Sequence, residues 1–181
     1  MKKILLAACF ALASTAMQAQ VWLGGSLGLN FQSADEVDKT TFTIAPEIGY
    51  KLNDKWDIAI GISEAYTNVN PDKGKSTSTN FFSVNPYARY TFASTGKVSF
   101  FLDGGFIVGT GDYYYDDHNY DDETSWGIGI RPGIKVDLTE HVALVARLGY
   151  FGYKHEGGPD VSSFGLGIDN NNISFGAYYA F

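Results

Sequence analysis

Residues 42–62 read FTIAPEIGYKLNDKWDIAIGI, and this stretch decides the fold. Apolar side chains occupy every second position from Phe42 to Leu52 and again from Trp56 to Ile62, with Pro46 in step. Successive side chains of a β-strand point to opposite faces, so this period of two predicts two strands. The intervening residues 53–55 are Asn-Asp-Lys, which suit a tight turn. The stretch therefore predicts two adjacent antiparallel strands that share one apolar face.

The same alternation continues along most of the remaining chain. Six further runs show it: Trp22–Phe31, Phe82–Phe92, Val98–Val108, Trp126–Leu138, Val142–Tyr150 and Ile173–Phe181. The runs are close to the length of about 9–11 residues with which a tilted strand crosses a bilayer. Short connections at 53–55, 93–96 and 139–140 alternate with long polar ones at 32–39, 68–79, 111–123 and 155–172. This pattern predicts an all-β protein, an eight-stranded antiparallel up-and-down transmembrane β-barrel with both termini in the periplasm.

The second face of the strands distinguishes a membrane barrel from a soluble barrel or a two-sheet sandwich. A soluble barrel needs an outer face rich in Lys and Glu, whereas here the less apolar face is mostly Gly, Ala, Ser and Thr. Such a face suits a narrow lumen. The apolar face carries aromatic residues near its two ends, as interfacial anchoring requires. We expect one belt at Tyr50, Trp56, Tyr90, Phe92 and Phe181, and the other at Phe42, Tyr66, Phe82, Trp126 and Tyr150.

The N-terminus predicts export of the protein. Lys2 and Lys3 precede an apolar run of ten residues, 4–13, which is half the length that a membrane helix needs. We interpret residues 1–19 as a signal peptide, cleaved after Ala16 or Ala19, and residues 20–181 as the barrel domain. Cys9 superficially resembles a lipidation site, but the apolar run continues past it. The 181-residue chain has a net charge of −7, and we expect no nucleic-acid partner because it has no basic cluster.

Four charged residues on the inner face predict a plug. Counted from the short turns, Glu47, Asp103, Arg131 and Arg147 all lie about 12–18 Å up the barrel, at about 2.5 Å per residue. An eight-stranded barrel is narrow enough for side chains to fill it, so two carboxylates and two guanidiniums at one level can neutralise each other. We expect Arg89 and Lys135 to form a lower basic layer that faces Asp57 and Asp137. The alternative is a water-filled lumen in which these charges never meet.

Two further motifs point to a family. Pro46, Pro86 and Pro132 each stand six residues before the last apolar residue of an even-numbered strand, which indicates a repeated hairpin module. The chain ends SFGAYYAF, and Ser174, Gly176, Tyr179 and Phe181 resemble the signal by which the barrel-assembly machinery recognises its clients. With the leader, residues 20–181 resemble the small outer-membrane β-barrel ("porin family") proteins of Gram-negative bacteria, of the OmpX and OmpA-barrel type. This resemblance implies fold and location more firmly than activity.

We expect no enzyme and no cofactor, because His118, His141 and His155 share no metal-ligand spacing and no nucleophile–base motif is present. Residues 112–123 hold six carboxylates and four tyrosines, so Asp116, Asp117, Asp121 and Asp122 are weak candidates for a divalent cation or for contact with lipopolysaccharide. The expected partners are outer-membrane lipid, lipopolysaccharide and the barrel-assembly machinery. The expected function is a structural or surface-interaction role through the long extracellular loops. The alternatives are a narrow channel or transporter for small or hydrophobic solutes, and a surface adhesin or virulence factor.

Overall fold

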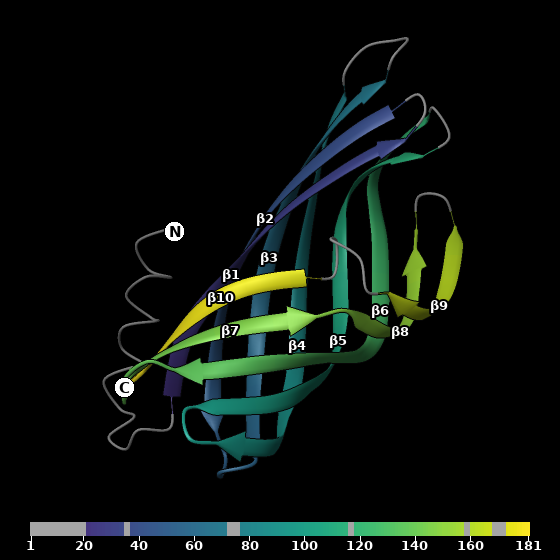
Figure 1. The fold of residues 1–181 in the computed structure, drawn as a ribbon. Helices are drawn as coiled ribbons and strands as arrows, with labels where there is room; N and C mark the ends of the chain where they lie inside the picture. The colour runs from purple at the N-terminus through teal and green to yellow at the C-terminus, as the bar shows by residue number, and fades with distance from the viewer. Residues whose placement is uncertain (1–20, 35–36, 72–76, 116–117, 158–159, 168–172) are drawn as a thin grey trace, which may run out of the picture.

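The computed structural model describes residues 21–34, 37–71, 77–115, 118–157, 160–167 and 173–181 (Figure 1). The predicted signal peptide, including both cleavage sites and Cys9, lies outside them. No helix long and apolar enough to cross a membrane occurs in this part of the chain. Its regular structure consists of ten strands: β1 (Val21–Ala34), β2 (Val37–Lys51), β3 (Trp56–Pro71), β4 (Thr77–Thr95), β5 (Val98–Tyr115), β6 (His118–Asp137), β7 (Val142–Leu148), β8 (Tyr150–Glu156), β9 (Val161–Gly167) and β10 (Ile173–Ala180).

These strands form a closed antiparallel barrel. β1 to β6 pair in chain order, β6 pairs with β7, β7 with β10, and β10 with β1, which closes the ring. Eight strands therefore surround the lumen, as the alternation predicts. The remaining strands β8 and β9 extend the wall at one end, where β8 pairs with β6 and β9 pairs with β8.

A β-bulge at Gly149 separates β7 from β8. β6 advances three residues between its pairs Gly133↔Arg147 and Ile130↔Phe151, while the opposite strand advances four. Gly149 has a φ of 82°, which an L side chain rarely adopts. The extra residue turns Tyr150 inward, where its ring lies over the backbone of Gly129. The prediction of Tyr150 in the outer aromatic belt was wrong for this reason, and Tyr153 instead packs beside Trp126 on the outside, with ring centroids 5.1 Å apart.

The long connections are largely strand, which corrects their prediction as loops. β5 continues to Tyr115 and β6 begins at His118, so most of 111–123 is a hairpin, and β9 lies within the predicted loop 155–172. Polar residues can continue a strand outside a bilayer because pairing satisfies their backbone groups. β6 has 20 residues, about twice what a crossing needs. We call these projecting hairpins the ribbons and that end of the barrel the ribbon end.

Side-chain hydrogen bonds close two of the short turns at the opposite end, here called the turn end. Asn53 Oδ1 accepts from the backbone amides of Lys55 and Trp56 at 2.9 and 3.0 Å. Thr139 Oγ1 accepts in the same way from the Val142 amide at 2.9 Å. Both described termini lie at this end, where the amide of Phe181 donates to the carbonyl of Val21 at 3.1 Å.

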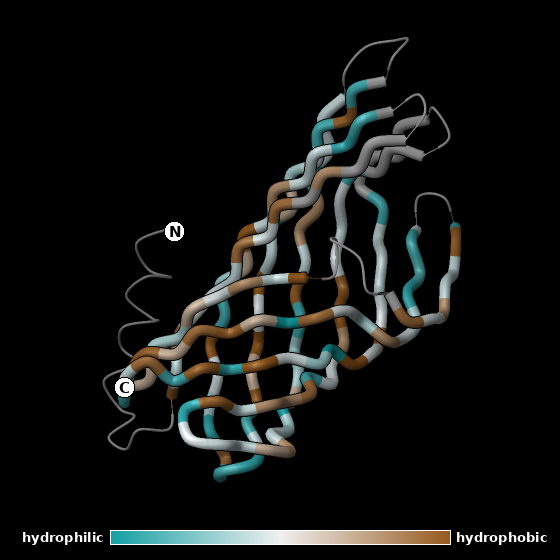
Figure 2. The backbone as a smooth tube through the Cα atoms, viewed as in Figure 1, coloured by the Kyte–Doolittle hydropathy of each residue, from teal (hydrophilic) through white to brown (hydrophobic). Residues whose placement is uncertain are grey.

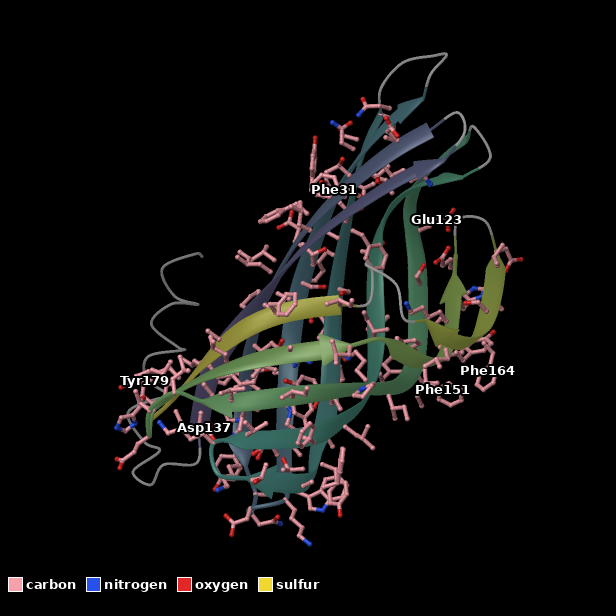
Figure 3. The ribbon with its side chains drawn as sticks, in the orientation of Figure 1. Phe31, Glu123, Asp137, Phe151, Phe164 and Tyr179 are labelled. Carbon is pink, nitrogen blue, oxygen red and sulfur yellow. The ribbon has the colours of Figure 1, made fainter. Side chains whose placement is uncertain are left out.

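Hydrophobic residues recur along the strands of the barrel wall (Figure 2), and many of their side chains are exposed. On β3, Ile58, Ile60 and Ile62 are 42–47% exposed, between Trp56 at one end and Tyr66 at the other. The ten residues from Trp56 to Tyr66 climb about 25 Å, the height of a membrane barrel's apolar band. Figure 3 shows Phe151, Phe164 and Tyr179 pointing away from the barrel. This surface suits a lipid surrounding.

The three prolines lie within strands and on the outer parity, as predicted. The pairing of one adjoining ladder is interrupted at each of them: between residues 44 and 47 of β2, 84 and 87 of β4, and 130 and 133 of β6. Proline has no amide hydrogen to donate, so an interrupted ladder is the expected consequence.

Candidate functional site: a charged plug in the lumen

Glycines of the inner wall make room for the large side chains of the lumen. A Cβ added to Gly133 would lie 2.3 Å from the ring of Phe101, and one added to Gly105 would lie 2.6 Å from the Cβ of Tyr87. A larger residue would collide with the ring of Phe101 at position 133, and with the Cβ and backbone of β4 at position 105. The alternation of glycine with apolar residues along the strands therefore leaves space inside the barrel for a few bulky groups.

Arg147 on β7 stands at the centre of these groups. Its Nη1 and Nη2 donate to the two carboxylate oxygens of Glu47 on β2 at 2.9 and 2.7 Å, and its Nε donates to Asp103 Oδ2 at 2.8 Å. Only 3% of Arg147 and 1% of Asp103 are exposed. The planar guanidinium fork fits a carboxylate with two parallel hydrogen bonds, so this contact fixes the geometry as well as the charge.

A second arginine completes the charge balance. Arg89 on β4 binds Asp103 through Nε and Nη2, at 2.7 and 2.8 Å. Its guanidinium carbon lies 3.8 Å from the ring centroid of Phe101, within the range of a cation–π contact. Arg89 is 2% exposed. Two carboxylates and two guanidiniums therefore meet in a single buried cluster.

Two tyrosines tie this cluster together. The hydroxyl of Tyr87 donates to Glu47, and the hydroxyl of Tyr178 donates to the same oxygen at 3.1 Å. Each hydroxyl also accepts from Arg147 Nη2, at 3.0 and 2.8 Å. The Tyr178 ring stacks on Trp22 with centroids 4.3 Å apart, which closes the turn-end side of the cluster. We call Glu47, Tyr87, Arg89, Asp103, Arg147 and Tyr178 the plug.

The plug differs from the predicted cluster in one member. The structure brings together Glu47, Asp103 and Arg147, but Arg131 makes no ion pair within the described residues. Asp103 stands directly opposite Arg131 in the β5–β6 ladder, yet both of its oxygens are occupied by Arg89 and Arg147. Arg131 instead meets the neutral amide of Asn85, whose oxygen accepts from its Nη2 at 2.5 Å when the amide is oriented to satisfy both groups.

Arg89 is the residue that sequence reasoning misplaced in a lower layer. The predicted strand ended at Phe92, but β4 continues to Thr95 and contains a bulge between Thr91 and Ala93. The extension places Arg89 six residues above the end of the strand, the bulge takes up one of these six, and Arg89 becomes the direct partner of Asp103 in the β4–β5 ladder. Lys135 pairs with Asp137 at 3.2 Å, as expected, nearer the turn end.

A cavity lies on each side of the plug. The turn-end cavity has a volume of about 480 Å³ and is lined by Arg89 and Tyr178 of the plug together with Lys135, Asp57 and Asp137. The ribbon-end cavity, of about 250 Å³, reaches Glu47 and Arg147 from the other side. Plug residues therefore contribute to the lining of both cavities. Both carboxylates of the plug, Glu47 and Asp103, form ion pairs with arginines, so the charges of the plug neutralise each other.

The remaining predicted site residues lie apart from the plug. Ser174, Gly176 and Tyr179 lie on β10, and Phe181 directly follows it. Gly176 lies so close to β1 that an added Cβ would be 2.4 Å from the Gly25 carbonyl oxygen. Tyr179 and Phe181 face outward and pack edge to face, with centroids 5.1 Å apart. Asp116 and Asp117 lie outside the described residues, as do the side chains of Asp121 and Asp122. Among the residues that are described, no three carboxylates, histidines or cysteines are grouped as metal ligands would be.

Comparison with known proteins agrees with this architecture. The model of the outer membrane protein beta-barrel domain family matches residues 4–181, so the chain belongs to that family. No curated protein sequence matches the chain. Among solved structures, the chain is similar to Neisserial surface protein A, with a TM-score of 0.63, 19% identity, and coverage of 91% of this chain and 98% of that one. It is also similar to the N-terminal β-barrel domain of Pseudomonas aeruginosa OprF, with a TM-score of 0.54, 16% identity, and coverage of 91% and 98%.

Proposed function

We propose that this outer-membrane β-barrel is a closed structural element that acts through its surface ribbons and does not pass solutes through its lumen. In this proposal the turn end and both termini face the periplasm, and the ribbons extend from the cell surface. The protein is not an enzyme in this view, and its partners are outer-membrane lipid, lipopolysaccharide and, during biogenesis, the barrel-assembly machinery.

The observation that carries the proposal is the charge balance of the plug. Glu47 and Asp103 are matched by Arg89 and Arg147, and all four are at most 8% exposed. A charge left without a partner in so narrow a space would cost several kcal/mol, and this opposes rearrangements that open a path. Ion passage requires such a rearrangement because the plug lies between the two cavities.

The ribbons support the other half of the proposal. β4, β5 and β6 have 19, 18 and 20 residues, and a crossing needs about ten of them. Hydrophilic residues occur on the ribbons as well as around the short turns (Figure 2). Roughly half of each of these strands therefore stands clear of the apolar band and is free to contact lipopolysaccharide or an external partner.

A conductance measurement tests the proposal. Refolded wild-type protein in a planar bilayer should give currents close to the lipid baseline. The double variant Glu47→Ala/Arg147→Ala removes a matched pair, leaves Arg89 with Asp103, and should raise the conductance. The control Lys135→Ala/Asp137→Ala removes a half-exposed pair outside the plug and should leave the conductance unchanged. A large, stable current through the wild type would refute the closed lumen and favour the channel or transporter.

A further inference from the structure

Arg131 is the one guanidinium near the plug that the plug does not neutralise. No carboxylate among the described residues lies within 4.0 Å of it, since Asp103 is already shared by two other arginines. Its polar partner is the uncharged amide of Asn85, which also donates to the carbonyl of Phe106 at 2.9 Å. A cation held by a neutral group in a narrow lumen retains most of its ability to bind an anion.

The ribbon-end cavity places this cation against an open space. Arg131 lines the cavity of about 250 Å³, together with Lys154 from β8 and hydroxyl groups from several strands. Ser26, Thr43, Ser63 and Ser174 supply those hydroxyls. The only carboxylate in the described lining is Glu47, and it is bound to Arg147. Of the two arginines in the lining, Arg147 is held by Glu47 and Asp103, whereas Arg131 has no carboxylate partner among the described residues.

We propose that this cavity is a binding site for an oxyanion, a carboxylate or a phosphate group, held by Arg131. The fork of the guanidinium suits two oxygens of one group, and the surrounding hydroxyls can donate to a third. The volume is below the 300–1,000 Å³ that is usual for drug-sized ligands, so the site admits a small anion or the head group of a larger molecule. The proposal goes beyond the proposed function and does not depend on whether the barrel conducts.

The bound group can belong to a soluble anion or to the head group of a lipid, and the barrel wall beside the cavity is compatible with both. Ser26 and Ser174 mark the last part of the β1–β10 seam, where described pairing ends at Leu27↔Phe175 although β1 continues to Ala34. On the outer face of the same seam lies an apolar groove of about 600 Å³, lined by Leu27, Gly28, Leu29, Phe42, Ile173 and Phe175. A soluble anion can enter from the ribbon end, and a lipid head group can approach from this groove.

The first arm of the test uses inorganic phosphate and the full barrel in a non-ionic detergent. Titration calorimetry and the melting temperature should show saturable binding for the wild type that sodium chloride at equal ionic strength does not reproduce. Arg131→Gln should weaken the binding about ten- to a hundredfold, the loss expected for hydrogen bonds to a charged group. Arg131→Lys keeps the charge and should restore part of the affinity. The gel mobility of unheated protein shows whether each variant is folded.

The second arm uses vesicles of phosphatidylcholine with and without phosphatidic acid. If phosphatidic acid stabilises the protein in a manner that depends on Arg131 and inorganic phosphate has no effect, the ligand is a lipid head group. If inorganic phosphate binds in a manner that depends on Arg131 and phosphatidic acid has no effect, the ligand is a soluble anion. The matched control is Lys135→Gln, which removes a cation from the same strand but lines the other cavity, and it should leave both arms unchanged. An equal response of wild type and Arg131→Gln in both arms, or no response beyond that to chloride, would overturn the proposal.

Discussion

Replacing Arg147 with methionine should destabilise the barrel severely, because the side chain has roughly the same length but cannot pair. Glu47 would keep only the hydroxyls of Tyr87 and Tyr178, while Asp103 would still hold Arg89 by two hydrogen bonds. Glu47 is 8% exposed, so its charge would be left nearly without solvent or a cation. Breaking a buried ion pair in this way costs about 3–5 kcal/mol.

A second substitution distinguishes charge pairing from loss of packing. In Arg147→Met/Glu47→Gln the unpaired carboxylate is gone, and the glutamine can still hydrogen bond with both tyrosines. The double variant should therefore lose about 2–3 kcal/mol less than the sum of the two single variants.

Urea titration of the protein in lipid vesicles measures these free energies of unfolding, and the fluorescence of Trp22, which stacks on Tyr178, reports on the plug. As a control, Lys135→Met/Asp137→Asn removes an ion pair whose side chains are 34% and 41% exposed, and it should cost less than about 1 kcal/mol. Additive costs of the two plug substitutions would refute the idea that the pairing of Glu47 with Arg147 stabilises the lumen.

Three further outcomes are expected. Gly176→Ala should hinder closure of the barrel, because the added Cβ would lie 2.4 Å from the Gly25 carbonyl oxygen. Gly165→Ala is the control, because no atom lies within 4 Å of its added Cβ, and thermal unfolding compares the two variants. Deleting Phe181 should lower the amount of protein in the outer membrane more than Phe164→Ala does, although Phe164 is the more exposed at 72%, and equal membrane levels would contradict a role of the C-terminus in assembly. Unheated protein should migrate differently from boiled protein on a denaturing gel, and recovery of a soluble periplasmic monomer would contradict the membrane barrel.

The alternation of side chains made the barrel wall predictable. In a strand the period of two is set by local geometry, so Ile58, Ile60 and Ile62 reveal their common face without knowledge of their neighbours. The ends of the strands were harder to predict from the sequence, because polar residues continue a paired strand outside the bilayer as readily as they form a loop. The long connections were misassigned for this reason.

The height of residues in the middle of regular strands was also predictable by counting from the short turns. Glu47, Asp103 and Arg147 could be assigned to one level because the rise per residue is nearly constant. The count failed for Arg89, where the strand continues to Thr95 around a bulge, and for the side of Tyr150, where Gly149 inserts one residue. A bulge has no reliable signal in a single sequence, and it changes height or side for every residue beyond it.

The sequence by itself thus determined the strand number, the closed antiparallel ring, the apolar outer face and the presence of inward charges of both signs. Only the tertiary structure decided which of these charges pair. Asp103 is the direct cross-strand partner of Arg89 on one neighbouring strand and of Arg131 on the other, so the strand pairing alone does not select between them. The two carboxylate oxygens of Asp103 accept hydrogen bonds from Arg89 and from Arg147, which lies across the lumen. Arg131 instead binds the amide of Asn85 and lines the ribbon-end cavity. That choice depends on side chains from strands distant in the sequence, whereas the period of a strand is a property of its own backbone.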